Sequence, residues 1–253
     1  MKNRYIFIIL FLILIMLPKV TWSDDSVNIN NIIESAKRNG EIESQIFLGL
    51  MFYNGNGVSR NYEEAMKWFR KAAEQGSAKA QANIGVIYYE GNGVPQDYSE
   101  AAKWYLKAAE QGIAIAQLNM GVFYYQGLGV TQNYSEAMRW YRKAAEQGID
   151  TAELNIGVMY HKGIGVPQNF SETLKWYRRA ANKMNKEALY NLGTMYSKSE
   201  GVPQDYIQAH KWFTLAANQG DRLAEEYRDQ IKMLMSSTQR AESHKLVTAW
   251  TPE

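Results

Sequence analysis

The chain repeats itself every 36 residues. A glycine, a tryptophan and a pair of alanines each recur five times at this step. The positions are Gly49, Gly85, Gly121, Gly157 and Gly193, then Trp68, Trp104, Trp140, Trp176 and Trp212, and the alanine pairs at 72–73, 108–109, 144–145, 180–181 and 216–217. A fixed period between about 20 and 50 residues is typical of stacked units, each of which buries its apolar face against the next. The pattern therefore favours function on an extended surface over function in one cleft.

Each unit has the pattern of a helical hairpin, as residues 77–112 show. Ala80, Ile84 and Ile87 recur at helical spacing and give the first helix one apolar face. Gly91 then supplies a left-handed terminator. The second helix has the small residue Ala108, which we expect to cross Gly85 of the first helix. Short links make the two helices antiparallel.

A capping box is expected at the start of each second helix. Asp97 is placed to accept hydrogen bonds from the first turn, and Glu100 follows three residues later as its reciprocal partner. The equivalent pairs are Asn61/Glu64, Asn133/Glu136, Asn169/Glu172 and Asp205/Gln208.

These signals predict an all-α chain, a solenoid of helical hairpins. The five units are 41–76, 77–112, 113–148, 149–184 and 185–220. Residues 24–40 are expected to form an N-terminal capping helix, and 221–253 C-terminal capping helices with a polar outer face. Thr173, Met184 and Ser199 depart from the repeat, which predicts a weaker junction between the fourth and fifth units.

The first residues predict export. Lys2 and Arg4 precede an apolar run from Tyr5 to Leu17, which Pro18 ends. Such a run is short for a membrane-spanning helix and typical of a secretory signal, so we expect residues 1–23 to be removed. The alternative is an uncleaved membrane anchor. A periplasmic or secreted protein is predicted, with no membrane span after cleavage.

Composition excludes several kinds of site. Loss of three basic residues with the signal leaves 25 against 26 acidic residues, so net charge does not indicate nucleic acid or an anionic membrane as partner. With no cysteine, the chain has no disulfide, thiol nucleophile or cysteine–zinc site. The three histidines occupy unrelated phases of the repeat, and no hydrolase or phosphate-loop motif occurs. We therefore expect a non-enzymatic protein without metal or cofactor.

The repeated residues resemble the Sel-1-like repeat, a relative of the tetratricopeptide repeat. The shared pattern, A-x-x-N-[LIM]-G-x-x-Y-x-x-G-x-G-V followed by A-x-x-W-[YF]-x-x-A-A-x-x-G, covers residues 41–220 in five in-phase copies. The resemblance implies a right-handed superhelix that serves as an adaptor for protein–protein interaction, often exported in bacteria. Some cysteine-rich members are linked with β-lactam binding or hydrolysis, and this chain lacks their cysteine pairs.

One face of the first helices is the candidate binding surface, because in a tetratricopeptide-like stack it lines the concave side. An asparagine amide can both donate to and accept from an extended peptide backbone, and an aromatic ring can anchor it. The candidate residues are Tyr53, Asn83, Val86, Tyr89, Asn119, Val122, Tyr125, Asn155, His161 and Asn191. A solvated face would be less apolar than this one, so the alternative is that the face packs on adjacent units. For the asparagines, a role in tying neighbouring first helices together is slightly favoured.

Three functions stay open at this stage. The leading one is an exported scaffold that binds a protein or extended peptide, of unknown identity, through this face. The second is binding of a cell-envelope polymer by the basic row Lys67/Lys71, Lys103/Lys107, Arg139/Lys143 and Lys175/Arg179, although such a row is usually a solvated face. The third is a hydrolase acting on β-lactam or cell-wall material. The oligomeric state does not follow from the sequence.

Overall fold

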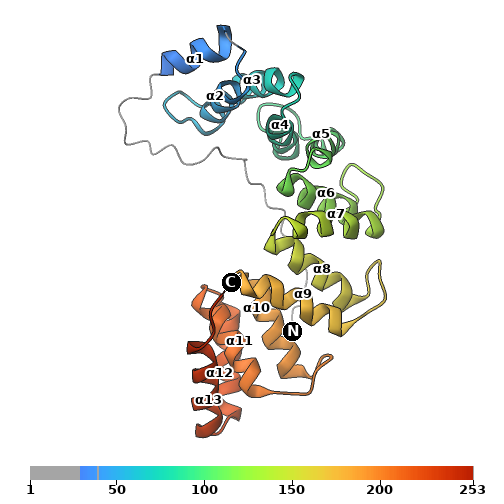
Figure 1. Ribbon diagram of the computed structural model, residues 1–253, viewed down its shortest axis with the longest axis vertical. Helices are drawn as coiled ribbons and strands as arrows, with labels where there is room; N and C mark the ends of the chain where they lie inside the picture. Colours follow the sequence, from blue (N-terminus) through green and yellow to red (C-terminus); the bar gives the residue numbers. More distant parts are fainter. Residues whose placement is uncertain (1–28, 39, 253) are drawn as a thin grey trace. The chain divides into compact units, whose positions relative to one another are not determined.

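The computed structural model describes residues 29–38 and 40–252, and every regular element in these ranges is a helix (Figure 1). The predicted signal segment lies outside them. The helices are α1 (Ile29–Arg38), α2 (Ile42–Asn54), α3 (Tyr62–Glu74), α4 (Ala78–Glu90), α5 (Tyr98–Glu110), α6 (Ala114–Gln126), α7 (Tyr134–Glu146), α8 (Asp150–Lys162), α9 (Phe170–Asn182), α10 (Lys186–Lys198), α11 (Tyr206–Asn218), α12 (Arg222–Leu234) and α13 (Ser237–Thr248). The all-helical prediction is confirmed.

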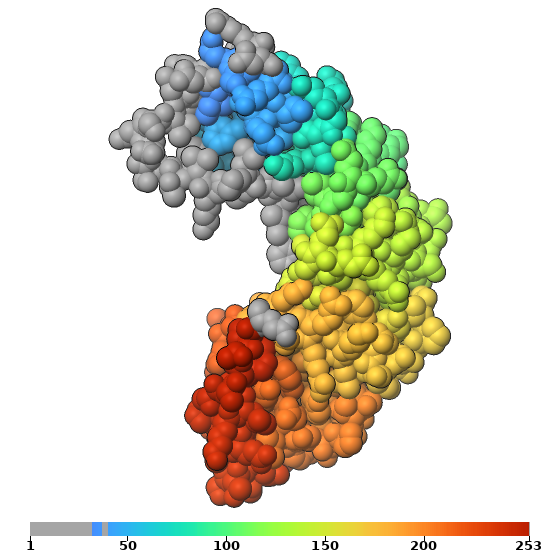
Figure 2. Space-filling view, viewed as in Figure 1, coloured from blue at the N-terminus to red at the C-terminus, as the bar shows by residue number. Residues whose placement is uncertain are grey.

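Consecutive helices pair as hairpins. Close contacts join α2 to α3, α4 to α5, α8 to α9 and α10 to α11, and further contacts join α3 to α4, α5 to α6 and α9 to α10. The chain forms two compact units that divide within α7, after Trp140. In the unit that ends the chain, α13 contacts α11, and Figure 2 shows its dark red surface beside the orange of the preceding helices.

The first helices are buried on nearly all sides, whereas the second helices keep one exposed face. In α4 every residue from Ala80 to Ile87 is buried. In α5 the buried residues recur at helical spacing as Ala101, Tyr105 and Ala108, with polar residues between them. The contacts of α4 with α3 and α5, and of α10 with α9 and α11, place each of these two first helices between its own second helix and the preceding one. The open face predicted on the first helices is largely covered.

Half of each predicted capping box is present. The Asp97 side chain accepts from the backbone amides of Ser99 and Glu100, and Asn61 accepts from that of Glu64 at 3.1 Å. The reciprocal half is wrong among the described second helices, because the backbone amide of the cap residue already donates to the first helix, as that of Asn61 does to the Phe52 carbonyl and that of Asp97 to the Tyr88 carbonyl. Glu64 and Glu100 pair with lysines three residues further on. Among the described helices, a complete capping box joins Ser236 and Gln239 at the start of α13.

In α2, α4, α8 and α10 the repeated glycine makes room for an aromatic ring. A Cβ atom added to Gly85 would lie 2.7 Å from Cδ1 of Tyr105, which is buried. The sequence predicted that Ala108 approaches Gly85. The residue that approaches Gly85 is instead Tyr105, one turn before Ala108. The same relation holds between Gly49 and Phe69, Gly157 and Tyr177, and Gly193 and Phe213.

Two residues that replace glycine keep the glycine conformation. Gly91 and its equivalents end the first helices with positive φ, and Ser199 occupies this position in the fifth unit with φ 60°. Met184 stands where Gly76, Gly112, Gly148 and Gly220 end or follow the second helices, and its φ is 61°. A side chain in this region costs roughly 1–2 kcal/mol, which places backbone strain at both ends of α10.

We expect Met184→Gly and Ser199→Gly each to stabilise the fifth hairpin by about 1 kcal/mol, because glycine accepts positive φ without a clash. Urea denaturation and hydrogen exchange of α10 measure the gain. The matched control is Gly163→Ser, which places a side chain at the equivalent left-handed position and should lose about as much. Unchanged exchange in α10 for both glycine variants contradicts the assignment of strain to these residues.

Candidate functional site

Most of the ten predicted site residues lie inside the helix layers. Only three of them, Tyr89, Tyr125 and His161, retain intermediate exposure. The other seven are buried, and these are Tyr53, Asn83, Val86, Asn119, Val122, Asn155 and Asn191. The helix layers cover these seven side chains, as the alternative of packing on adjacent units expects. Whether the three accessible residues bind a partner stays a prediction.

The asparagine row of the first helices lies in the interior of the fold. Asn119 is completely buried beside Tyr105 of the preceding hairpin. Burial raises the pKa of the Tyr105 hydroxyl well above its ordinary value, and the Asn119 amide acts in the opposite direction. An enclosed amide that faces the neighbouring hairpin cannot reach an extended peptide in this arrangement. This burial favours a role for Asn119 in packing between hairpins, and its Nδ2 and Oδ1 atoms make no hydrogen bond to another described residue.

Tyr53 also joins two hairpins. Its hydroxyl donates to the Glu90 carboxylate and accepts from Nδ2 of Asn92 at 3.0 Å. Burial, followed by the Glu90 contact, raises the pKa of Tyr53. At the equivalent positions of the fourth junction, Nε2 of His161 lies 3.1 Å from Oε2 of Glu200. The repeat thus uses this pair of positions as a polar link between successive hairpins.

Tyr89 and Tyr125 occupy the same repeat position but keep their hydroxyls unpaired among the described residues. The position of Asn92 is taken by Leu128 and Ile164 in the following units, and neither side chain can bond a phenol. The rings still pack: Tyr89 lies 5.4 Å from Tyr98, centroid to centroid. Tyr125 lies 5.3 Å from Tyr134. Each tyrosine therefore presents a half-buried ring with an available donor.

The predicted basic row is largely neutralised. Lys67 lies 2.6 Å from Glu64, Lys103 lies 2.7 Å from Glu100, and Arg139 lies 2.6 Å from Glu136. The second cation of several helices lies over the repeated tryptophan, as Lys71 does over Trp68 and Lys107 over Trp104. The glutamates offset the first cation of each pair, whereas a cation over a tryptophan ring keeps its charge, so the row offers an anionic polymer less net charge than the sequence indicates.

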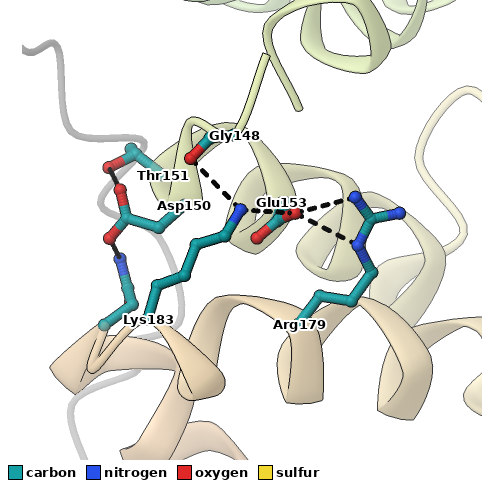
Figure 3. Close-up of polar contacts among 7 residues, drawn as sticks. Gly148, Asp150, Thr151, Glu153, Arg179 and Lys183 are labelled. Atoms are coloured by element: carbon teal, nitrogen blue, oxygen red, sulfur yellow. Dashed lines mark hydrogen bonds and ion pairs between the residues drawn. The ribbon is translucent and has the colours of Figure 1, made fainter. Parts of the chain in front are cut away.

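A charge cluster that the sequence analysis missed lies between α8 and α9 (Figure 3). The Glu153 carboxylate is fully buried, and its Oε1 atom lies 2.9 Å from both Nη2 of Arg179 and Nζ of Lys183. Lys183 also donates to the carbonyl oxygen of Gly148 at 3.1 Å. Next to it, Nδ2 of Asn185 donates to Asp150 at 2.8 Å. The cluster fastens the start of α8 to the end of α9.

The repeat register shows what this cluster replaces. In the first and second units the same two positions form amide pairs, in which Gln75 donates to Gln45 at 2.8 Å and Gln111 donates to Gln81 at 2.9 Å. The fourth unit substitutes Glu for one glutamine and Lys for the other. This coupled exchange is visible in the sequence once the units are aligned. Its role in the structure is to join helices.

His210 joins the last helix to the fifth hairpin. Its Nδ1 atom lies 2.9 Å from Oγ of Ser243, which is fully buried in α13. Burial lowers the pKa of His210, and the charges of Arg228 and Lys232 in α12 and Arg240 in α13 act in the same direction. Asp229 opposes them. The neutral imidazole is thus the form that the folded cap favours.

A pH dependence follows from this shift. A histidine whose folded pKa is depressed stabilises the native state fully above its unfolded pKa of about 6.5, and the contribution is lost as pH falls through the folded value. We expect hydrogen exchange in α13, measured relative to the intrinsic rate of an unprotected amide at the same pH, to accelerate as pH falls from about 7 to about 5. In His210→Asn, whose amide can still bond Ser243, this acceleration should shrink. An equal acceleration in both proteins contradicts the role of His210.

The described residues offer no metal or membrane site. No group of three or more His, Cys, Asp or Glu side chains there is arranged to hold a metal ion. None of the helices α1–α13 is both long and apolar enough to cross a bilayer.

Comparison with known proteins shows the family. The model of the Sel1 repeat matches residues 42–77, 78–113, 114–149, 151–183 and 186–221. Among solved structures, the protective antigen c5321 of uropathogenic Escherichia coli, which has an SLR fold, matches with TM-score 0.79 and 37% identity over 85% of this chain. A Sel1 repeat protein from Oxalobacter formigenes matches with TM-score 0.75 and 37% identity over 79% of this chain and 83% of its own.

The match to c5321 covers only 46% of that protein, so this chain spans about half its length. A search of curated proteins finds no match. Sel1 repeat proteins generally mediate protein–protein interactions, on a fold that is a non-catalytic repeat scaffold. With five matched copies, the chain belongs to the Sel1 repeat family.

Proposed function

We propose that this chain is an exported adaptor that binds a protein or extended peptide through the surface around Tyr89 and Tyr125. The observation that carries the proposal is the pair of half-buried tyrosines whose hydroxyls have no partner among the described residues. At the same repeat position, Tyr53 uses its hydroxyl within the fold. Tyrosine combines a rigid apolar ring with a polar tip, which suits it to protein interfaces.

The test needs substitutions that preserve the packing of the two rings. Tyr89→Phe with Tyr125→Phe removes the two hydroxyls and keeps the ring contacts with Tyr98 and Tyr134. We expect partner capture by protein isolated from its native cell to fall by about tenfold, since two interfacial hydrogen bonds are lost. The melting curve should not change. Capture equal to that of the parent counts against this surface.

Two control variants separate binding from packing. Tyr53→Phe loses bonds to Glu90 and Asn92 and should lower stability without affecting capture. Tyr89→Ser with Tyr125→Ser removes rings that pack within the fold, so it should lower the melting temperature as well as capture. A stable serine variant contradicts the ring packing described above.

Export is the second part of the proposal, and its support is the short apolar run from Tyr5 to Leu17 after two basic residues. The expected product begins near Asp24. Intact-mass measurement of protein from the native cell tests this. A mass that retains Met1, found in the membrane fraction, indicates an anchored protein instead.

A further inference from the structure

Two connectors of the chain carry the same four residues at the same repeat position. The sequence Gly-Asn-Gly-Val occurs at 55–58, between α2 and α3, and again at 91–94, between α4 and α5. The glycine that follows the asparagine has a left-handed backbone in both connectors, with φ of 71° at Gly57 and 73° at Gly93. Local sequence and glycine conformation are thus matched, so a difference in reactivity between Asn56 and Asn92 comes from their surroundings.

An asparagine followed by glycine can lose its side-chain amide without an enzyme. The backbone nitrogen of the glycine gives up its proton and attacks Cγ of the asparagine, the new N–Cγ bond closes a succinimide ring, and the Cγ–Nδ2 bond breaks to release ammonia. Water then opens the ring at either carbonyl, which leaves aspartate or isoaspartate. Glycine favours the attack because it has no Cβ atom to obstruct it and its backbone turns freely. The reaction consumes only water and involves no oxidation or reduction.

The Asn92 side chain is held by its neighbours. Its Nδ2 atom donates to Oε2 of Glu90 at 2.6 Å and to the Tyr53 hydroxyl at 3.0 Å, so the leaving group is fixed by two hydrogen bonds. Gly93 is also confined, because a Cβ atom added to it would lie 2.6 Å from Cβ of Tyr62 at the start of α3. Both hydrogen bonds must break before Nδ2 leaves, and the contact with α3 restricts the turn of the glycine toward Cγ.

Asn56 lacks this protection. Its side chain is exposed and makes no hydrogen bond to another described residue. The tyrosine that holds Asn92 comes from the preceding hairpin, whereas Asn56 lies in the first hairpin. The neighbouring pair Asn54–Gly55 is less open to attack, since the Gly55 nitrogen donates to the Met51 carbonyl at 2.8 Å. Of these three asparagines, Asn56 is therefore the most reactive.

We propose that Asn56 is a site of spontaneous deamidation, and that the bonds of Asn92 to Tyr53 and Glu90 protect the equivalent connector from the same reaction. At Asn56 the product adds a negative charge, and in the isoaspartate form an extra backbone methylene, to an exposed connector. At Asn92 the product would exchange the Nδ2 donor for an oxygen and set a second carboxylate beside Glu90. The protected asparagine is thus the one whose amide joins two hairpins.

Peptide mapping by mass spectrometry, after incubation of the full mature chain in mildly alkaline buffer, measures the reaction. Each Asn–Gly pair is followed separately, including that at 39–40, whose asparagine is outside the described residues. We expect Asn56 to deamidate at least about tenfold faster than Asn92, because each hydrogen bond of Nδ2 is worth about 1 kcal/mol and both must open. A methyltransferase specific for isoaspartate should label the same peptide.

Variants at the two connectors test the cause of the difference. Tyr53→Phe with Glu90→Ala removes both acceptors of the Asn92 amide and should bring its rate within about threefold of that at Asn56. Asn56→Gln is the matched control, because a longer side chain closes the ring far more slowly. Modification at this position should then cease, while the rate at Asn92 stays the same.

The denatured chain separates the effect of the fold from that of the sequence. In guanidinium the hydrogen bonds of Asn92 are lost, so Asn56 and Asn92 should react at similar rates within their identical four-residue segments. A difference that persists in the denatured chain overturns the protective role of Tyr53 and Glu90. Equal rates at Asn56 and Asn92 in the folded chain overturn it as well, and slower reaction at Asn56 than at Asn54 overturns the choice of site.

Discussion

Removal of both cations from Glu153 is expected to destabilise the α8–α9 hairpin by about 3–5 kcal/mol. The variant is Arg179→Gln with Lys183→Gln, which leaves a fully buried carboxylate without a counter-charge. Its Oε2 atom already has no hydrogen-bond partner among the described residues, so the desolvation of the carboxylate is offset through Oε1 alone. Both cations are partly exposed, and water that enters the site brings the effect toward the lower end of this range.

The matched control restores the repeat. Glu153→Gln with Lys183→Gln recreates the amide pair that Gln81 and Gln111 form in the second unit. We expect this variant to lie within about 1 kcal/mol of the parent, since two well-bonded amides replace a buried charge pair. Lys183→Gln alone leaves Arg179 on the carboxylate and should fall between the two.

Urea denaturation followed by hydrogen exchange of α8 and α9 measures these effects. Local exchange is the more direct readout, because a repeat protein couples mainly nearest neighbours and opens locally. Equal stability of the double-cation variant and the glutamine-pair variant contradicts the idea that Glu153 depends on its cations.

Much of the fold follows from the sequence because periodicity reports it directly. The 36-residue period recurs five times, with a helix-ending residue at the position of Gly91 and a capping residue at the position of Asp97 in each unit. These two signals leave little freedom in where the helices begin and end. The caps accept backbone hydrogen bonds as predicted. The glutamates do not return those bonds, because the backbone amide of each cap residue already donates to a carbonyl oxygen of the preceding helix, as that of Asp97 does to Tyr88.

The exposure of the candidate face could not be predicted from a helical wheel. A wheel shows which residues of one helix share a side, but not how many neighbouring helices cover it. Asn83 and Val86 lie opposite the hairpin contact and are still buried, and the second helix of the preceding hairpin, α3, also contacts α4. The apolar character of that side was the available signal, and it indicated packing.

The charged residues show more clearly what the sequence analysis missed, because a motif read one residue at a time does not reveal which charges pair. Glu153 and Lys183 look unrelated in the sequence, and their meaning emerges only when each is compared with the glutamine at the same repeat position. Departures from a repeat are therefore more informative about local sites than the repeated residues.

The glycine at the helix crossing gives the second large prediction. Gly157→Ala would place a Cβ atom 2.5 Å from Cδ1 and 2.6 Å from Cε1 of Tyr177, whose ring is buried in the core of the second compact unit. Overpacking of this kind costs about 1–3 kcal/mol or more, and alanine returns up to about 1 kcal/mol through helix propensity. Because the ring is rigid and enclosed, we expect a net loss of about 2 kcal/mol, centred on α8 and α9.

A second glycine in the same unit separates steric clash from backbone strain. Gly220 has φ 80° and no atom within 4 Å of an added Cβ, so Gly220→Ala tests the left-handed conformation alone and should cost about 1 kcal/mol. Gly157→Ala should be the more damaging change, although its backbone is helical and alanine favours helix. If Gly157→Ala instead raises stability, helix propensity outweighs the contact with Tyr177, and the five repeated glycines are not needed to admit the aromatic ring.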